Sequence, residues 1–144
     1  MTAPAATRTH AETATRLRTA IARLNRRLRQ QTVGELTLSQ WSALVAVESA
    51  GRMRIGDLAA HEHVSAPTAT RLVASLEIEG LLGRQVDDDD RRSALISLTD
   101  QGRQSLAELR RKRTEALAAR LAGLSAADLD HLVRALPVLE QLSG

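Results

Sequence analysis

The sequence predicts a mainly α-helical fold with one small β-hairpin. Phe and Tyr are absent and Trp41 is the single aromatic residue. The core must therefore come from Leu, Val, Ile and Ala, which favours close-packed helices over an aromatic-rich sandwich. Apolar residues recur at spacings of three and four along most of the chain, and only residues 81–98 combine alternating segments with a polar centre. The length of 144 residues is typical of one compact domain.

The composition already excludes several classes of function. There is no cysteine, which rules out disulfides, thiolate metal sites and cysteine-based redox switches. Lys112 is the only lysine among twenty basic residues, and arginine suits forked contacts with phosphate and base edges. No apolar run approaches the roughly 18 residues of a membrane span, and the start of the chain lacks the layout of a secretory signal. We therefore expect a cytoplasmic protein with no membrane partner.

The first two helices are predicted from apolar spacing and from end signals. An amphipathic helix is expected over residues 11–31, after a frayed start. Thr37 or Ser39 can cap a second helix, which Gly51 ends.

The next segment predicts two short helices joined by a tight turn. Ile55 and Leu58 mark the first helix, Ser65 opens the second, and Gly80 ends it. Residues 61–64 form the connection, so the pair is typical of a helix-turn-helix.

Two short strands and two further helices complete the chain. The strands are expected at residues 81–86 and 93–98, although Leu95 interrupts the alternation of the second one. Thr99 can cap a long helix to about residue 122. Ser125 can cap a last apolar helix, which Pro137 should bend.

This order of elements predicts a winged helix-turn-helix flanked by terminal dimerisation helices. Residues 34–100 would form the DNA-binding region, and residues 1–33 and 101–144 a helical dimerisation region. The terminal helices carry more apolar surface than one thin domain can cover, so we expect them to pair with a second copy of the chain.

The candidate DNA-binding residues lie on the second helix of the motif. In such a unit the first turns of this helix enter the major groove, so outward side chains must be small or able to form hydrogen bonds. Ala69, Leu72 and Val73 are expected to point inward. The outward set is Ser65, Pro67, Thr68, Thr70 and Arg71. Threonine methyls can touch thymine, and arginine can reach guanine O6 and N7.

The hairpin tip supplies a second set of candidates. Four consecutive aspartates, Asp87 to Asp90, would repel DNA if all of them faced it. Arg91 and Arg92 follow them, and a carboxylate beside an arginine can hold the guanidinium in one orientation for a minor groove. We expect Asp90 to hold Arg92 in this way.

Residues 34–102 resemble members of the MarR family of transcriptional regulators. The segments that carry the resemblance are Ser65–Val73, Leu76–Arg84, and Asp90-Arg91-Arg92-Ser93 followed by Leu98-Thr99 and Gly102. The resemblance implies an obligate homodimer on double-stranded DNA. The helix at Ser65 would lie in the major groove and the Arg92 wing in the minor groove. It also implies repression relieved by a small ligand, often an anionic aromatic compound.

The resemblance does not transfer to every feature. The acidic Asp87–Asp89 run replaces mixed or basic residues, and the absence of cysteine excludes the oxidation-sensing branch. No ligand-binding residue can be assigned. Trp41, His10, Arg16 and Arg18 are the expected neighbours of a ligand, with Trp41 more typical of a core anchor.

Two other classes of function remain alternatives to a DNA-binding regulator. An enzyme would need a nucleophile beside a base, or paired carboxylates in a cleft, and the sequence offers neither pattern. We expect no catalytic residue, no cofactor and no metal site, since His61 and His63 are too close together to share a helix face. A winged-helix module for protein assembly, without direct DNA readout, fits the same sequence pattern.

Overall fold

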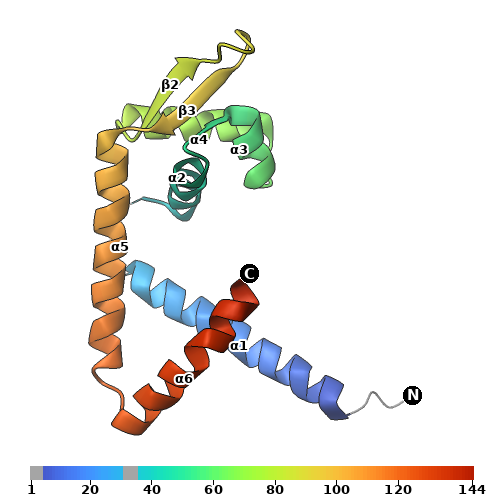
Figure 1. Cartoon of the computed structure of the whole chain (residues 1–144), viewed down its shortest axis with the longest axis vertical. Coiled ribbons are helices and arrows are strands. Elements are labelled where there is room, and N and C mark those ends of the chain that lie inside the picture. Colours follow the sequence, from blue (N-terminus) through green and yellow to red (C-terminus); the bar gives the residue numbers. More distant parts are fainter. Residues whose placement is uncertain (1–4, 31–35) are drawn as a thin grey trace. The chain divides into compact units, whose positions relative to one another are not determined.

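The computed structural model describes the backbone of residues 5–30 and 36–144. It confirms the mainly helical fold with a small β-hairpin (Figure 1). The elements are α1 (Ala5–Gln30), α2 (Leu38–Ala50), β1 (Arg52–Arg54), α3 (Ile55–His61), α4 (Ala66–Ile78), β2 (Leu82–Val86), β3 (Ala94–Leu98), α5 (Asp100–Leu121) and α6 (Ala126–Ser143).

The chain divides into two compact units. Residues 34–111 form what we call the central unit, and residues 1–33 together with 112–144 form the terminal-helix unit. Helix α5 contributes its first half to the central unit and its second half to the terminal-helix unit.

The sheet of the central unit has three antiparallel strands in the order β1-β3-β2. Strands β2 and β3 pair as the predicted hairpin, with Leu82 opposite Leu98 and Val86 opposite Ala94. Strand β1 pairs with the other edge of β3 and was not predicted from the sequence. A segment of three residues, Arg-Met-Arg, is too short to show the alternation by which a strand is predicted.

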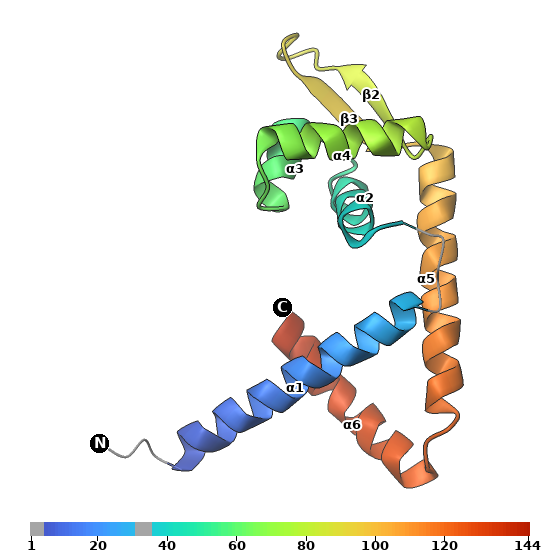
Figure 2. The same ribbon diagram turned by 180° about the vertical axis from the view of Figure 1, so that it is seen from behind.

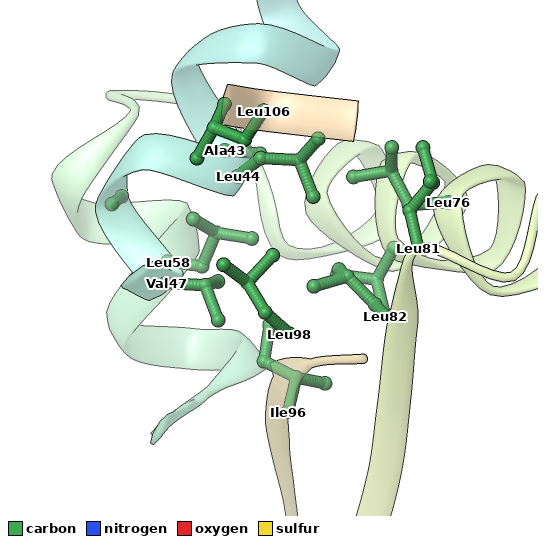
Figure 3. Packing of buried hydrophobic residues seen from close by; sticks show 12 residues of the cluster. Ala43, Leu44, Val47, Leu58, Leu76, Leu81, Leu82, Ile96, Leu98 and Leu106 are labelled. Carbon is green, nitrogen blue, oxygen red and sulfur yellow. The ribbon is translucent and has the colours of Figure 1, made fainter. Parts of the chain in front are cut away.

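A single apolar core holds the central unit together. Its largest fully buried side chains come from four helices and one strand: Leu44 and Val47 of α2, Leu58 of α3, Val73 and Leu76 of α4, Ile96 of β3 and Leu106 of α5. Figure 3 shows these elements converging, with Leu58 and Val47 close to Leu98 and Ile96. Because this core fixes the inner face of α4, it also determines which residues of α4 face outward.

The predicted helix caps are present where the structure describes them. Thr37 Oγ1 accepts from Gln40 N, and the Gln40 side chain accepts from Thr37 N, which completes a capping box. Ser125 caps α6 by accepting from Asp128 N. Thr99 Oγ1 accepts from Gly102 N at the start of α5.

Two observations refine the predicted helix ends. Helix α1 begins at Ala5, six residues before the predicted start, because its first residues, Ala-Ala-Thr-Arg, include strong helix formers. Its predicted end at Gln31 lies outside the described residues. Helix α6 continues through Pro137 to Ser143.

The terminal-helix unit leaves large apolar side chains in contact with solvent. None of the residues of α6 is buried. The exposed apolar side chains on α1 and α6 are Ile21, Leu24, Leu129, Val133, Leu136, Val138 and Leu142. No helix within the described ranges is long and apolar enough to cross a membrane.

Candidate DNA interface

Helices α3 and α4 form the predicted helix-turn-helix. They pack against each other, and α3 lies at one end of α4 (Figure 2). The turn between them contains His63 with φ of 54°, the one non-glycine residue of positive φ among the described residues. Ser65 caps α4, its Oγ accepting from Thr68 N at 3.3 Å, and Pro67 stands in the first helical turn.

The outer side of α4 carries the predicted set of small and polar residues. Ser65, Pro67, Thr68, Thr70 and Arg71 are all exposed; we call them the reading face. Ala69 and Val73 are fully buried, as predicted, and Leu72 is half-buried against the core. A groove in DNA could therefore approach this side of α4 without disturbing the core.

The hydroxyl groups of the reading face differ in what they offer a ligand. Thr70 Oγ1 donates its proton to the Ala66 carbonyl oxygen at 2.9 Å, so it presents only lone pairs and a methyl group outward. Ser65 Oγ and Thr68 Oγ1 lie 2.8 Å apart, so one of the two hydroxyls donates its proton to the other. That pair keeps one hydroxyl proton free to donate to a phosphate oxygen.

The wing tip, residues 87–92, connects β2 to β3 as a turn. Asp88, Asp89, Asp90, Arg91 and Arg92 are exposed, whereas Asp87 is only 3% exposed. The tip therefore presents three carboxylates and two guanidinium groups to solvent. The fourth aspartate of the run, Asp87, is buried.

The expected pairing of Asp90 with the Arg92 guanidinium is wrong. Asp90 Oδ1 accepts instead from the backbone N–H of Arg92, at 3.1 Å. The segment is a turn and not an extended strand, so the carboxylate reaches the main chain two residues on, as aspartate commonly does in turns. Asp90 thus shapes the backbone under Arg92 and leaves its side chain exposed.

Asp87 is the carboxylate that binds a guanidinium. Its Oδ2 lies 2.6 Å from Arg54 Nε and also 2.6 Å from Arg54 Nη2. The hydrogen bonds from Arg54 hold the pKa of the Asp87 carboxyl below its usual value, and a bond from the Asp89 N–H acts in the same direction. No sequence pattern links two residues that stand 33 positions apart.

A second guanidinium–carboxylate pair ties the wing to α4. Arg84 on β2 donates from Nε and Nη2 to the two carboxylate oxygens of Glu77, at 2.9 and 3.0 Å. This forked geometry forms two parallel hydrogen bonds and fixes the relative orientation of the two side chains. The base of the wing is therefore fixed relative to the reading face.

A cavity of about 620 Å³ lies in the central unit on the side of α2 and α5. Its lining residues are Leu36, Gln40, Glu79, Leu81, Gln101, Ser105, Glu108 and Leu109. Trp41, His10, Arg16 and Arg18, the expected neighbours of a ligand, are described but do not line it. Trp41 packs against the core instead, beneath the guanidinium of Arg110 at 5.9 Å from the ring centroid.

The histidines are not arranged as a metal site. His61 Nδ1 lies 3.0 Å from Glu62 Oε1, and Ser42 also donates to that carboxylate. Over the residues that the structure describes, no three His, Cys, Asp or Glu side chains come together to hold a metal ion.

The fold defines a winged helix-turn-helix protein, with small and polar residues exposed on the second helix of the motif. A model of the MarR family matches residues 36–94. An uncharacterized HTH-type transcriptional regulator of Mycobacterium bovis is 38% identical over 123 residues, which cover 85% of this chain and 86% of the relative. The chain belongs to the MarR family, whose members are DNA-binding transcriptional regulators.

Solved structures agree with this assignment. A MarR family protein from Bacillus stearothermophilus is 30% identical, with a TM-score of 0.74 over 94% of this chain and 96% of that one. A mutant of S. aureus MepR bound to an oligodeoxyribonucleotide has a TM-score of 0.70 at 19% identity, covering 91% of this chain and 97% of that one. The second likeness concerns the fold alone.

Proposed function

We propose that this chain is a homodimeric repressor that reads a pseudo-palindromic operator. The observation that carries the proposal is the combination of the exposed reading face on α4 with Arg91 and Arg92 on an exposed wing tip. Such a regulator acts in the cytoplasm, where a bacterial chromosome is found. We infer no catalytic activity, because the family to which the chain belongs is one of transcriptional regulators.

In the major groove, the side chains of the reading face have different roles. Arg71 is long enough to donate to guanine O6 and N7. The Thr70 hydroxyl donates its proton to the Ala66 carbonyl oxygen. Its oxygen can therefore accept from a base amino group, and its methyl group can contact a thymine methyl, but it has no proton to donate to a phosphate. Ser65 and Thr68 stand at the helix N-terminus, where a free hydroxyl proton and the helix dipole favour a phosphate.

In the minor groove, we assign contacts to Arg91 and Arg92. A narrow minor groove attracts arginine, and a β-hairpin tip can insert it beside the helix that reads the major groove. Asp90 contributes by holding the backbone N–H of Arg92.

The dimer is assigned to residues 1–33 and 101–144, and the DNA-binding region to residues 34–100. Support comes from the exposed apolar side chains of α1 and α6, which a second copy would cover. Two reading faces in a symmetric dimer imply half-sites about one helical turn, roughly 34 Å, apart.

A small effector that relieves repression is part of the proposal, and the cavity in the central unit is its site. Leu36, Leu81 and Leu109 offer an apolar wall. Glu79 and Glu108 also line the cavity, and Arg111 binds the carboxylate of Glu108. The carboxylate of Glu79 favours a neutral or cationic ligand over the anionic aromatic one that the family resemblance implies. Binding there would shift DNA affinity only as far as the ligand prefers a DNA-incompetent state.

Arg71→Ala and Arg92→Ala test the proposed contacts. Duplexes enriched from a random library by the unaltered protein serve as the operator, and binding is followed by fluorescence anisotropy at several salt concentrations. Arg71→Ala should weaken binding by roughly 5- to 150-fold and relax selection at one base pair, as loss of a forked base contact does. Arg92→Ala should weaken binding and lower the salt slope by about one.

The matched control is Arg134→Ala, which removes an exposed arginine of α6 that is paired with Asp130. It should leave operator affinity unchanged, and all three variants should remain dimeric. Unaltered affinity of both test variants at equal salt contradicts the proposed contacts. If a well-folded dimer enriches no duplex at low salt, the protein-assembly alternative is favoured. A reporter fused to the operator then distinguishes repression from activation.

A further inference from the structure

The ion pair between Arg54 and Asp87 joins the two edge strands of the sheet. The register places Arg54 of β1, Leu95 of β3 and Gln85 of β2 in one row. Asp87 lies two residues beyond Gln85 and therefore on the same face. The guanidinium of Arg54 thus reaches across the central strand, beside Leu95, to a carboxylate at the far end of β2.

The same carboxylate collects the hydrogen bonds that begin the wing tip. Asp87 Oδ1 accepts from the backbone N–H of Asp89 at 3.0 Å. The Ser93 hydroxyl lies 3.4 Å from Asp87 Oδ2 and 3.1 Å from the Asp90 carbonyl oxygen, so its one proton is divided between these two acceptors. The backbone N–H of Asp87 donates to the Ser93 carbonyl at 3.2 Å and closes the hairpin. Asp87 therefore joins both ends of the tip to a residue of β1.

The rest of the tip is built from Asp90 and Ser93. The Ser93 N–H donates to the Asp90 carbonyl at 2.9 Å, and the Arg92 N–H donates to Asp90 Oδ1 at 3.1 Å. Arg91 and Arg92 lie between these two residues. Their backbone position thus depends on a turn whose only side-chain anchor outside the hairpin, among the described residues, is Arg54.

The charges on the tip make DNA affinity sensitive to the position of Arg91 and Arg92. Asp88, Asp89 and Asp90 are exposed beside Arg91 and Arg92, so the exposed tip carries no net positive charge that would attract DNA from a distance. Arg54 adds none, because its charge is already paired with Asp87. Attraction must come from a guanidinium placed closely in the groove while the carboxylates stay away from the phosphates.

We propose that Asp87 and Arg54 are positioning residues for DNA binding, which fix the wing tip so that Arg91 and Arg92 enter the minor groove. This inference rests on the proposed role of the two wing arginines. Neither Asp87 nor Arg54 needs to touch DNA. Their contribution to affinity should therefore exist only when the wing arginines are present.

A double-mutant cycle tests this dependence. Asp87→Asn is nearly isosteric and keeps an oxygen for the Asp89 N–H, but it loses the charge that binds Arg54. Affinity for the library-selected duplex is measured in the wild type, in Asp87→Asn, in Arg91→Ala with Arg92→Ala, and in the triple variant. We expect Asp87→Asn to weaken wild-type binding roughly tenfold, the size of one lost charge-assisted hydrogen bond. In the background without wing arginines it should change affinity less than about twofold.

Arg54→Gln breaks the same ion pair by changing its half-exposed partner. This variant is used in place of Asp87→Asn if Asp87→Asn fails to fold. The control is Glu48→Gln, which breaks another guanidinium–carboxylate pair of the central unit, with Arg110. Its effect, whatever its size, should be equal in both backgrounds. Circular dichroism and thermal melting monitor folding in every variant.

The results separate the inference from the function on which it rests. If Asp87→Asn weakens binding equally in both backgrounds, or not at all in the wild type, Asp87 and Arg54 are not positioning residues. If removing both wing arginines leaves affinity unchanged, the proposed minor-groove contact itself is wrong.

Discussion

At the scale of single residues, a close backbone contact explains why a glycine, Gly102, stands in the first turn of α5. A Cβ at this position would lie 2.1 Å from the carbonyl oxygen of Leu81. That carbonyl also accepts from the Thr99 N–H, and Thr99 Oγ1 donates to the Gly80 carbonyl at 2.6 Å. The first turn of α5 is thus attached directly to the backbone in front of β2, and only glycine permits the approach.

Gly102→Ala should therefore destabilise the protein, by about 1–3 kcal/mol or more, because the backbone has to move away. Gly56→Ala is the matched control. Gly56 is helical, and a Cβ there meets nothing within 4 Å, so alanine should stabilise by roughly 0.5–1 kcal/mol. Chemical denaturation of the two variants measures both changes. Equal effects of the two substitutions contradict the close contact at Leu81.

The residue scale also marks the limit of prediction from the sequence. The caps at Thr37, Ser65 and Ser125 were predictable because each one acts on a backbone group three residues away. The pair Arg54–Asp87 was not, because its members stand 33 residues apart and come together only through β1, which was itself missed. The role of Asp90 was misplaced for a related reason, since the tip is a turn and not an extended chain.

At the scale of elements, ion pairs add to contacts between helices and strands that already share the apolar core. Arg110 of α5 donates to both carboxylate oxygens of Glu48 on α2, at 2.6 and 3.1 Å, and covers Trp41. The hydrogen bond from Arg110 lowers the pKa of Glu48 from its ordinary value. Arg54 lowers the pKa of Asp87 between β1 and β2 in the same way.

These lowered pKa values predict loss of stability in acid. A carboxyl whose pKa is lower in the folded state contributes stability above its unfolded pKa, about 3.9 for Asp and 4.3 for Glu. That contribution disappears as the pH falls through the folded pKa. The thermal midpoint of the wild type should therefore fall more steeply below about pH 4 than that of the double variant Glu48→Gln with Asp87→Asn. Parallel curves would exclude a role for these two carboxyls.

At the scale of the whole molecule, the last helix leaves large apolar side chains exposed in the single chain. The apolar spacing of the last helix was visible in the sequence, and the structure leaves Leu129, Val133, Leu136 and Leu142 exposed on α6. The sequence predicts that such a surface binds a partner, because exposing contiguous apolar side chains to water is unfavourable. It could not predict the partner's arrangement, since that depends on contacts between two chains.

Leu136→Glu tests whether a second copy covers this surface. Leu136 is 45% exposed in the single chain, and a carboxylate buried against another copy without a partner would weaken association strongly. We expect the dimer to dissociate at micromolar concentrations in sedimentation experiments and operator affinity to fall with it, because one reading face alone binds only a half-site. Gln141→Glu adds the same charge at a polar position of α6 and should leave the dimer intact. A Leu136→Glu protein that stays dimeric places the interface elsewhere.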